Sequence, residues 1–170
     1  FFEQELFRQR GIWDKYMFDG KPDTFFSVWY RETEDMRIRS GALRVQFGKG
    51  IKVDRLILQA LEKEEDFPLE LSADVTADLN GWQPIRFRLD EAAPQESVDV
   101  AYITRNGSGV RYDKHQIITY VADLEAAMDL RYLRCSPAPG RVSSVAAALN
   151  GNMLDRSDWR GSNLFGRLSA

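Results

Sequence analysis

The chain has 170 residues, of which 44% are hydrophobic and 29% are charged, and this is the composition of a globular domain rather than of a disordered or fibrous chain. A chain of this length buries roughly 70% of its unfolded surface, so it needs neither a disulfide nor a metal in order to fold. The net charge of −3 offers no basic field for nucleic acid, and no apolar run approaches the roughly 20 residues of a membrane span. We therefore expect one domain, with no nucleic-acid partner and no transmembrane segment.

The start of the chain contains no Met and no signal-type apolar stretch, so we expect a processed chain or a piece of a larger protein. In residues 1–10 the side chains of Phe2 and Leu6 fall on one helical face before Gly11, which predicts a short N-terminal helix or the end of a linker. Further along, the single cysteine, Cys135, has no partner for an internal disulfide, and we expect a buried thiol.

From residue 43 onward, apolar and polar residues alternate in short segments, which is the pattern of half-buried strands. The expected strands cover residues 43–47, 51–58, 69–73, 85–89, 98–103, 117–121, 130–135 and 142–147. Turn signals separate many of them, and the glycines in residues 48–50 predict that the first two strands pair as a hairpin. Residues 123–129 are compatible with one helical turn. About eight short antiparallel strands predict an all-β sandwich or jelly roll.

The sequence contains few of the residue patterns that enzymes use. Its only histidine is His115, so a histidine-rich metal site is excluded, and no nucleophile elbow, zinc-protease helix or phosphate-binding glycine loop is present. We expect no enzyme. A catalytic centre would need His115 together with Asp113 or nearby carboxylates in one pocket.

Four segments, in this order, resemble the discoidin-like family, also called coagulation-factor type C or galactose-binding-like domains, and are similar to bacterial carbohydrate-binding modules. They are YMFDGKPDTFFS (16–27), LRVQFGKGIKVDRLILQ (43–59), PLELSADVTADLNGWQPIRF (68–87) and LRYLRCSPAPGRVSSVAAALNG (130–151). The resemblance implies a galactose-binding-like, antiparallel jelly-roll β-sandwich over residues 16–151. Residues 1–15 would then be the N-terminal helix or linker. Residues 152–170 would be a C-terminal tail packed on the sandwich, with Trp159 as its anchor.

In this family the first loop holds a structural calcium ion through carboxylate and backbone oxygens. The resemblance assigns this role to Phe18, Asp19, Lys21, Asp23 and Thr24. Two positions depart from the family pattern: Lys21 stands where a second Asp is common, and Ser144 or Ala146 stands where a late glutamate is usual. The alternative is a turn in which Asp19 caps backbone N–H groups and no metal binds.

The resemblance also implies a ligand site in loops at one end of the sandwich, commonly for terminal sugars. Sugar recognition needs an aromatic face for the ring and planar donors and acceptors for its hydroxyls. Candidates are Trp29, Tyr30 and Arg31, and on a second turn Arg105, Asn106, Arg111, Tyr112 and His115. For Trp29 a structural role in the core is the alternative, and His115 could instead be an ordinary hydrogen-bonded side chain. Trp82 matches a family position that packs under a turn, so the resemblance implies a structural role for it.

These features lead to two hypotheses about function. The first is a non-catalytic carbohydrate-binding module, part of a larger carbohydrate-active or cell-surface protein and located outside the cell or at its surface. Its partner would be a glycan, with calcium as the one implied cofactor. The second is a structural or protein-interaction domain that packs against a neighbouring catalytic domain and binds no soluble ligand. An exposed aromatic beside polar groups in a cleft would favour the first, and a large exposed apolar patch the second.

Overall fold

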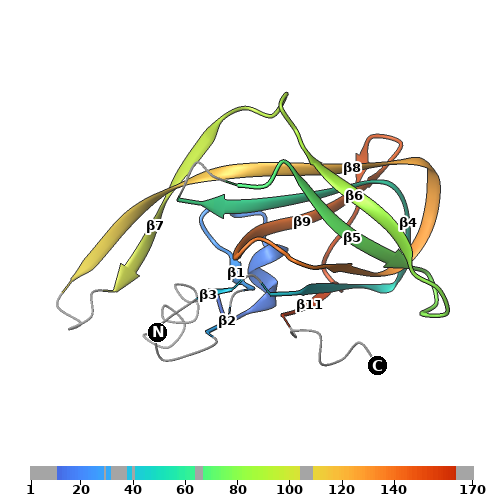
Figure 1. Cartoon of the computed structure of the whole chain (residues 1–170), viewed down its shortest axis with the longest axis horizontal. Helices are drawn as coiled ribbons and strands as arrows, with labels where there is room; N and C mark the ends of the chain where they lie inside the picture. The colour runs from blue at the N-terminus through green and yellow to red at the C-terminus, as the bar shows by residue number, and fades with distance from the viewer. Residues whose placement is uncertain are drawn as a thin grey trace.

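The structure is a computed structural model that describes residues 11–28, 30–31, 38–39, 41–63, 67–103 and 109–163. The helix predicted for residues 1–10 lies outside the described residues. After one 3₁₀ turn, η1 (Asp14–Met17), the regular elements are all strands (Figure 1). They are β1 (Phe26–Ser27), β2 (Tyr30–Arg31), β3 (Ile38–Arg39), β4 (Leu43–Glu62), β5 (Glu70–Thr76), β6 (Gln83–Leu89), β7 (Glu96–Ile103), β8 (Val110–Cys135), β9 (Arg141–Leu149), β10 (Asn152–Met153) and β11 (Arg160–Ser162).

Every strand pairing in the described residues is antiparallel. The main sheet has nine strands in the order β1-β9-β4-β8-β5-β6, with β10 on β9, β11 on β4 and β7 on β8, while β2 and β3 pair separately. The all-β antiparallel prediction is therefore confirmed. Among the residues that the structure describes, no helix has the length and the apolarity that a membrane crossing requires.

The prediction of a hairpin at residues 48–50 is wrong. The chain continues in one direction through these residues, and the two expected strands are the halves of β4, both of which pair with β8. Residues 47–50 lie between the paired positions Gln46 and Ile51, so they form an irregularity rather than a reversal. Gly48 and Gly50 allow it, because their φ angles of 56° and 116° are in a region that disfavours other residues.

The helical turn considered for residues 123–129 is also absent. These residues belong to β8, and only residues 124–127 leave the ladder, opposite Asp54. Their flanks are held extended by hydrogen bonds to β4 on both sides, and one isolated helical turn cannot compete with that pairing. The side chains of Leu124 and Met128 still pack against the core.

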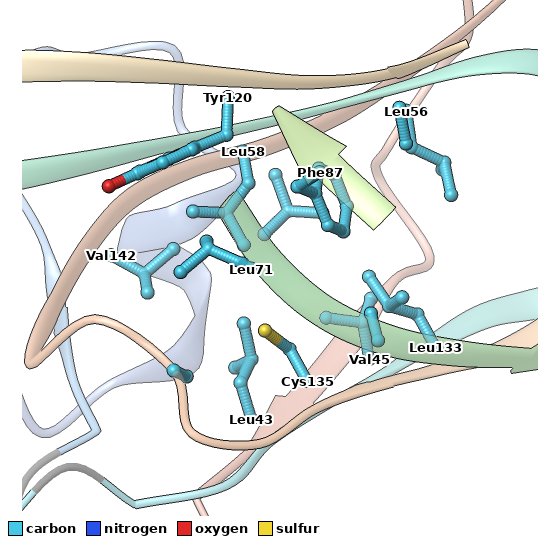
Figure 2. Packing of buried hydrophobic residues seen from close by; sticks show 14 of the residues in the cluster. Leu43, Val45, Leu56, Leu58, Leu71, Phe87, Tyr120, Leu133, Cys135 and Val142 are labelled. Atoms are coloured by element: carbon cyan, nitrogen blue, oxygen red, sulfur yellow. The ribbon is translucent and has the colours of Figure 1, made fainter. Parts of the chain in front are cut away.

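The two irregularities let β4 and β8 bend, and the sheet folds over on itself into a sandwich-like arrangement (Figure 1). In one layer residues 43–46 pair with 132–135, and β5 adds to their edge; in the other, residues 55–62 pair with 116–123, beside β9. The core lies between them, with Leu43, Val45, Leu133 and Cys135 facing Leu56, Leu58, Tyr120 and Val142 (Figure 2).

The C-terminal segment closes one side of this core. The indole of Trp159 is 1% exposed and makes edge-to-face contacts with Phe47 and Phe18, at centroid distances of 4.8 and 5.8 Å. Strand β11 follows directly and pairs with β4. Residues 159–162 are therefore packed on the sheet.

Gly48 gives a test of the bend in β4. A Cβ at this position would displace the carboxylate of Asp158, which is exposed and can rotate away, so the main cost is the backbone strain at a φ of 56°. We expect Gly48→Ala to lower the free energy of unfolding by about 1–2 kcal/mol in urea titrations. Gly81→Ala is the control, because the φ of Gly81 lies outside the left-handed region and no atom lies near its Cβ. Equal losses in the two variants would contradict the strained backbone at Gly48.

Cys135 gives a second test of the core. Its side chain is fully buried, as expected from the sequence, and burial raises the pKa of the thiol to about 12. Since the thiolate is the reactive form, iodoacetamide at pH 8 should leave the native protein unmodified and should label it fully in urea, as read by mass spectrometry. Rapid labelling of the native protein would show that Cys135 is accessible.

Candidate functional site

A groove of about 930 Å³ opens between the connection from β6 to β7 and the first half of β8. Its lining is mixed, with Phe67 and Leu89 as apolar members and with amide, hydroxyl, ammonium and carboxylate groups around them. The polar side chains of the lining include Gln116, Ser97, Lys114, Glu91 and Glu96. Such a lining can offer both donors and acceptors to a hydroxylated ligand.

Strand periodicity connects this groove to one of the predicted site residues. On β8, Tyr112, Lys114 and Gln116 alternate with their neighbours and therefore share one face of the strand. Their partners on β7 are Ala101, Asp99 and Ser97. Tyr112 is 66% exposed, so its phenol ring is open to solvent on the face that leads into the groove.

His115 lies on the opposite face of the same strand. It is 0% exposed and its Nδ1 lies 3.2 Å from the backbone oxygen of Asp113, which can only accept, so this nitrogen carries the proton. Val100 and Leu61 are buried on this face, in a small cluster with Phe25. The structure therefore separates His115 and Arg111 from Tyr112, and the predicted residues of β8 do not converge in one site.

The carboxylate of Asp113 is part of an ion-pair network. It accepts hydrogen bonds from Lys63 and Arg111, each at 3.0 Å. The bond from Lys63 is the main reason why the pKa of Asp113 is below its usual value. His115 thus contacts the backbone oxygen of Asp113, while the carboxylate of Asp113 accepts hydrogen bonds from Lys63 and Arg111.

The remaining residues predicted for the sugar site lie partly outside the described part of the chain. Trp29, Arg105 and Asn106 lie outside the described residues. Tyr30 and Arg31 form β2, for which the backbone pairing with β3 is described. Trp82 is half-buried and stacks on Arg134, whose guanidinium carbon lies 4.0 Å from the ring centroid.

The predicted calcium loop is a compact turn closed by side-chain hydrogen bonds. The Thr24 hydroxyl lies 2.6 Å from one carboxylate oxygen of Asp19, and the backbone N–H of Lys21 donates to the other at 3.0 Å. The carbonyls of Tyr16 and Lys21 are each 3.2 Å from the same hydroxyl. The other two residues assigned to this loop, Phe18 and Asp23, are half-buried.

Arg156 approaches the same turn from the C-terminal segment. One of its guanidinium nitrogens donates to the Ser144 hydroxyl at 3.0 Å, to the Val145 carbonyl at 2.9 Å and to the Met17 carbonyl at 3.4 Å. A calcium ion needs six to eight free oxygen ligands. Here both oxygens of Asp19 already accept hydrogen bonds and a guanidinium lies beside the turn, which is a poor fit to that requirement. The calcium assignment stays a prediction.

Within the described part of the chain, no group of three or more His, Cys, Asp or Glu side chains is placed to hold a metal ion. Searches against protein-family models, curated proteins and solved structures find no match to this chain.

The sequence reasoning missed the groove residues Lys114 and Gln116. The signal that could have found them is the two-residue period of the strand, which places positions 112, 114 and 116 on one face. Phe67, Ser97 and Glu91 come from other parts of the chain, and no local pattern connects them to Tyr112.

The buried His115 predicts a pH dependence of stability. Burial lowers its pKa below the usual 6.5, and the charges of Arg141 and Lys63 act in the same direction, against the backbone and charge of Asp113. The unfolded chain therefore takes up a proton near pH 6.5 while the folded protein does not, so stability is complete above pH 6.5 and declines as the pH falls. We expect the free energy of unfolding to fall by up to about 1.4 kcal/mol per pH unit between pH 6.5 and 5.5.

Urea titrations at pH 5.5, 6.5 and 7.5 measure this slope. His115→Asn keeps a donor at the Nδ1 position without titrating, and should remove most of it. Burial raises the pKa of Glu62, so protonation of its carboxyl group stabilises the folded protein as the pH falls toward 4.5. This effect opposes that of His115, and the series therefore stops at pH 5.5. An equal slope in wild type and His115→Asn would contradict this assignment.

Proposed function

We propose that this chain is a non-catalytic carbohydrate-binding module. The observation that supports the proposal most is the open groove of about 930 Å³ with the exposed phenol ring of Tyr112 on the same face of β8. The ring of Tyr112 can stack on the apolar face of one sugar unit, while Lys114, Gln116 and Ser97, further along the same face, can bond to hydroxyl groups of the following units of an oligosaccharide.

The finer assignment of the fold belongs to the same proposal. A discoidin-like, galactose-binding-like jelly roll is supported by the antiparallel two-layer arrangement and by the turn at residues 16–24 beside β9. In this proposal the chain works as an accessory domain of a larger carbohydrate-active or cell-surface protein, outside the cell or at its surface. It would hold its partner near a glycan, which raises the effective concentration without new chemistry.

Glycan-array binding of the whole chain, followed by titration of the best glycan, tests the proposal. Tyr112→Ala and Gln116→Ala should each weaken binding by about 5- to 10-fold, because stacking and a hydrogen bond to a charge-free amide each contribute about 1–1.5 kcal/mol. Trp82→Ala is the matched aromatic control and should bind normally, because Trp82 stacks on Arg134 at the other end of β8.

Two outcomes would count against the proposal. Binding that is lost in Trp82→Ala but kept in Tyr112→Ala would move the site to the other end of the sheet. No glycan binding by wild type would favour the other hypothesis, a structural or protein-interaction domain that packs against a neighbouring catalytic domain.

A further inference from the structure

The layer built on residues 43–46 of β4 has an outward face on which arginines gather. In this layer β11, β4, β8, β5 and β6 lie side by side, and alternate side chains, such as Val45 and Leu133, point into the core. The side chains between them point outward. At the paired positions the outward charged residues are Arg44, Arg86, Arg88, Arg134, Arg160, Glu70 and Asp74. We call this surface the arginine face. Five positive and two negative charges give it a net charge of +3, in a chain whose net charge is −3.

Two of these arginines are held close together although their charges repel. Arg44 and Arg134 are direct partners in the ladder between β4 and β8, and like charges at such positions destabilise a sheet. Both guanidinium groups lie near the ring of Trp82, at 5.9 and 4.0 Å from its centroid. Nε of Arg134 lies 3.4 Å from the carboxylate of Asp74, whereas Arg44 has no acidic partner among the described residues. One carboxylate therefore serves two cations.

The contact with Trp82 leaves these cations able to bind an anion. A guanidinium that stacks on an indole uses its flat face and keeps its N–H groups at the edge available. A carboxylate can accept two parallel hydrogen bonds from such an edge, and bonds of this kind are about twice as strong as those between neutral groups. A further carboxylate beside Arg44 and Arg134 would thus offset their repulsion.

The other arginines extend the positive charge across the layer. Arg86 and Arg88 share the carboxylate of Glu70, at 2.8 and 3.7 Å, and their side chains are 58% and 74% exposed. Arg160 is also exposed, and its described hydrogen bond goes to the backbone carbonyl of Trp159. From β11 to β6 the face spans about 20 Å, at about 4.8 Å per strand. One small anion cannot reach all of these cations, but an extended partner with several carboxylates can.

We propose that the arginine face is a docking surface for an acidic segment of a protein partner, one that presents several Asp or Glu side chains. Charge complementarity selects the carboxylates. Arg, Trp and Tyr are the residue types that contribute most to binding at protein–protein interfaces, and Trp82 and Tyr132 lie among the arginines on this face. The groove near Tyr112 is at the other end of β8, so the proposal does not depend on glycan binding.

The first experiment measures binding of a fluorescein-labelled peptide of about ten glutamates by fluorescence anisotropy. We expect saturable binding in 50 mM NaCl that weakens by about 10-fold or more in 300 mM NaCl, because salt screens exposed charges. An oligolysine peptide of the same length should not bind. Absence of saturable binding of the glutamate peptide at low salt would overturn the proposal. Heparin that binds through Arg44 while the glutamate peptide does not would also overturn it, and would assign the face to an acidic polysaccharide.

The second experiment repeats the titration with Arg44→Gln and Arg134→Gln. Each variant removes charge-assisted hydrogen bonds, so we expect each to weaken binding by about 10-fold. Arg111→Gln is the matched control, because it removes the same charge from an exposed arginine at the start of β8, and it should change binding by less than about 2-fold. Equal weakening in all three variants would show a response to net charge alone and would overturn the proposal.

Thermal unfolding separates docking from a structural role of Arg44. We expect the midpoint of Arg44→Gln to stay within about 2 °C of wild type, because removal of one of two opposed charges offsets the lost contact with Trp82. A fall of more than about 5 °C together with unchanged peptide binding would overturn the proposal. If Arg44→Gln does not fold, the exposed Arg160 supplies the second variant, and unchanged binding in both Arg160→Gln and Arg134→Gln would overturn the proposal as well.

Discussion

The pairing of β4 with β8 is the interaction on which the rest of the structure depends. These two strands run beside each other over most of their lengths, and each leaves the ladder at a different place, residues 47–50 on β4 and 124–127 on β8. Because both strands pass through the bend, the two halves of the sheet cannot separate without breaking one continuous ladder. β5, β6, β9 and β11 then extend the two halves, and the buried side chains of Leu133 and Leu58 lie in the interior that results.

The same continuity decides what lies on each side of β8. Along its first half, alternate side chains face either the open groove or the apolar cluster with Phe25 and Leu61. Tyr112 and His115 are three positions apart, an odd number, so they fall on opposite faces and cannot meet in one site. The groove at this end is lined by Lys114, Gln116 and Ile118 on one face of β8, together with the adjacent Ile117 and Thr119 and the connection between β6 and β7.

Local sequence patterns were enough for the strands but not for their connections. Alternation correctly placed the strands at residues 85–89 and 142–147. The glycines at positions 48 and 50 predict a reversal that the structure does not contain, because a glycine pair permits either a hairpin or a bend, and only the partner strand decides between them. That partner, β8, lies more than 60 residues further along the chain.

Local sequence patterns predict the candidate sites even less well than they predict the connections between strands. Composition and motifs identified Asp19, Thr24 and Tyr112 as residues worth testing, because acidic turns and exposed aromatics have local signatures. Arg156 has none: it is one of many arginines, and its contact with Met17 spans nearly the whole chain. Its position follows from coordinates alone, because the guanidinium donates to oxygens of Met17, Ser144 and Val145, which lie far from it in the sequence. The segment after β9 is thus bonded both to β9 and to the first turn, and changes in either segment must be read together.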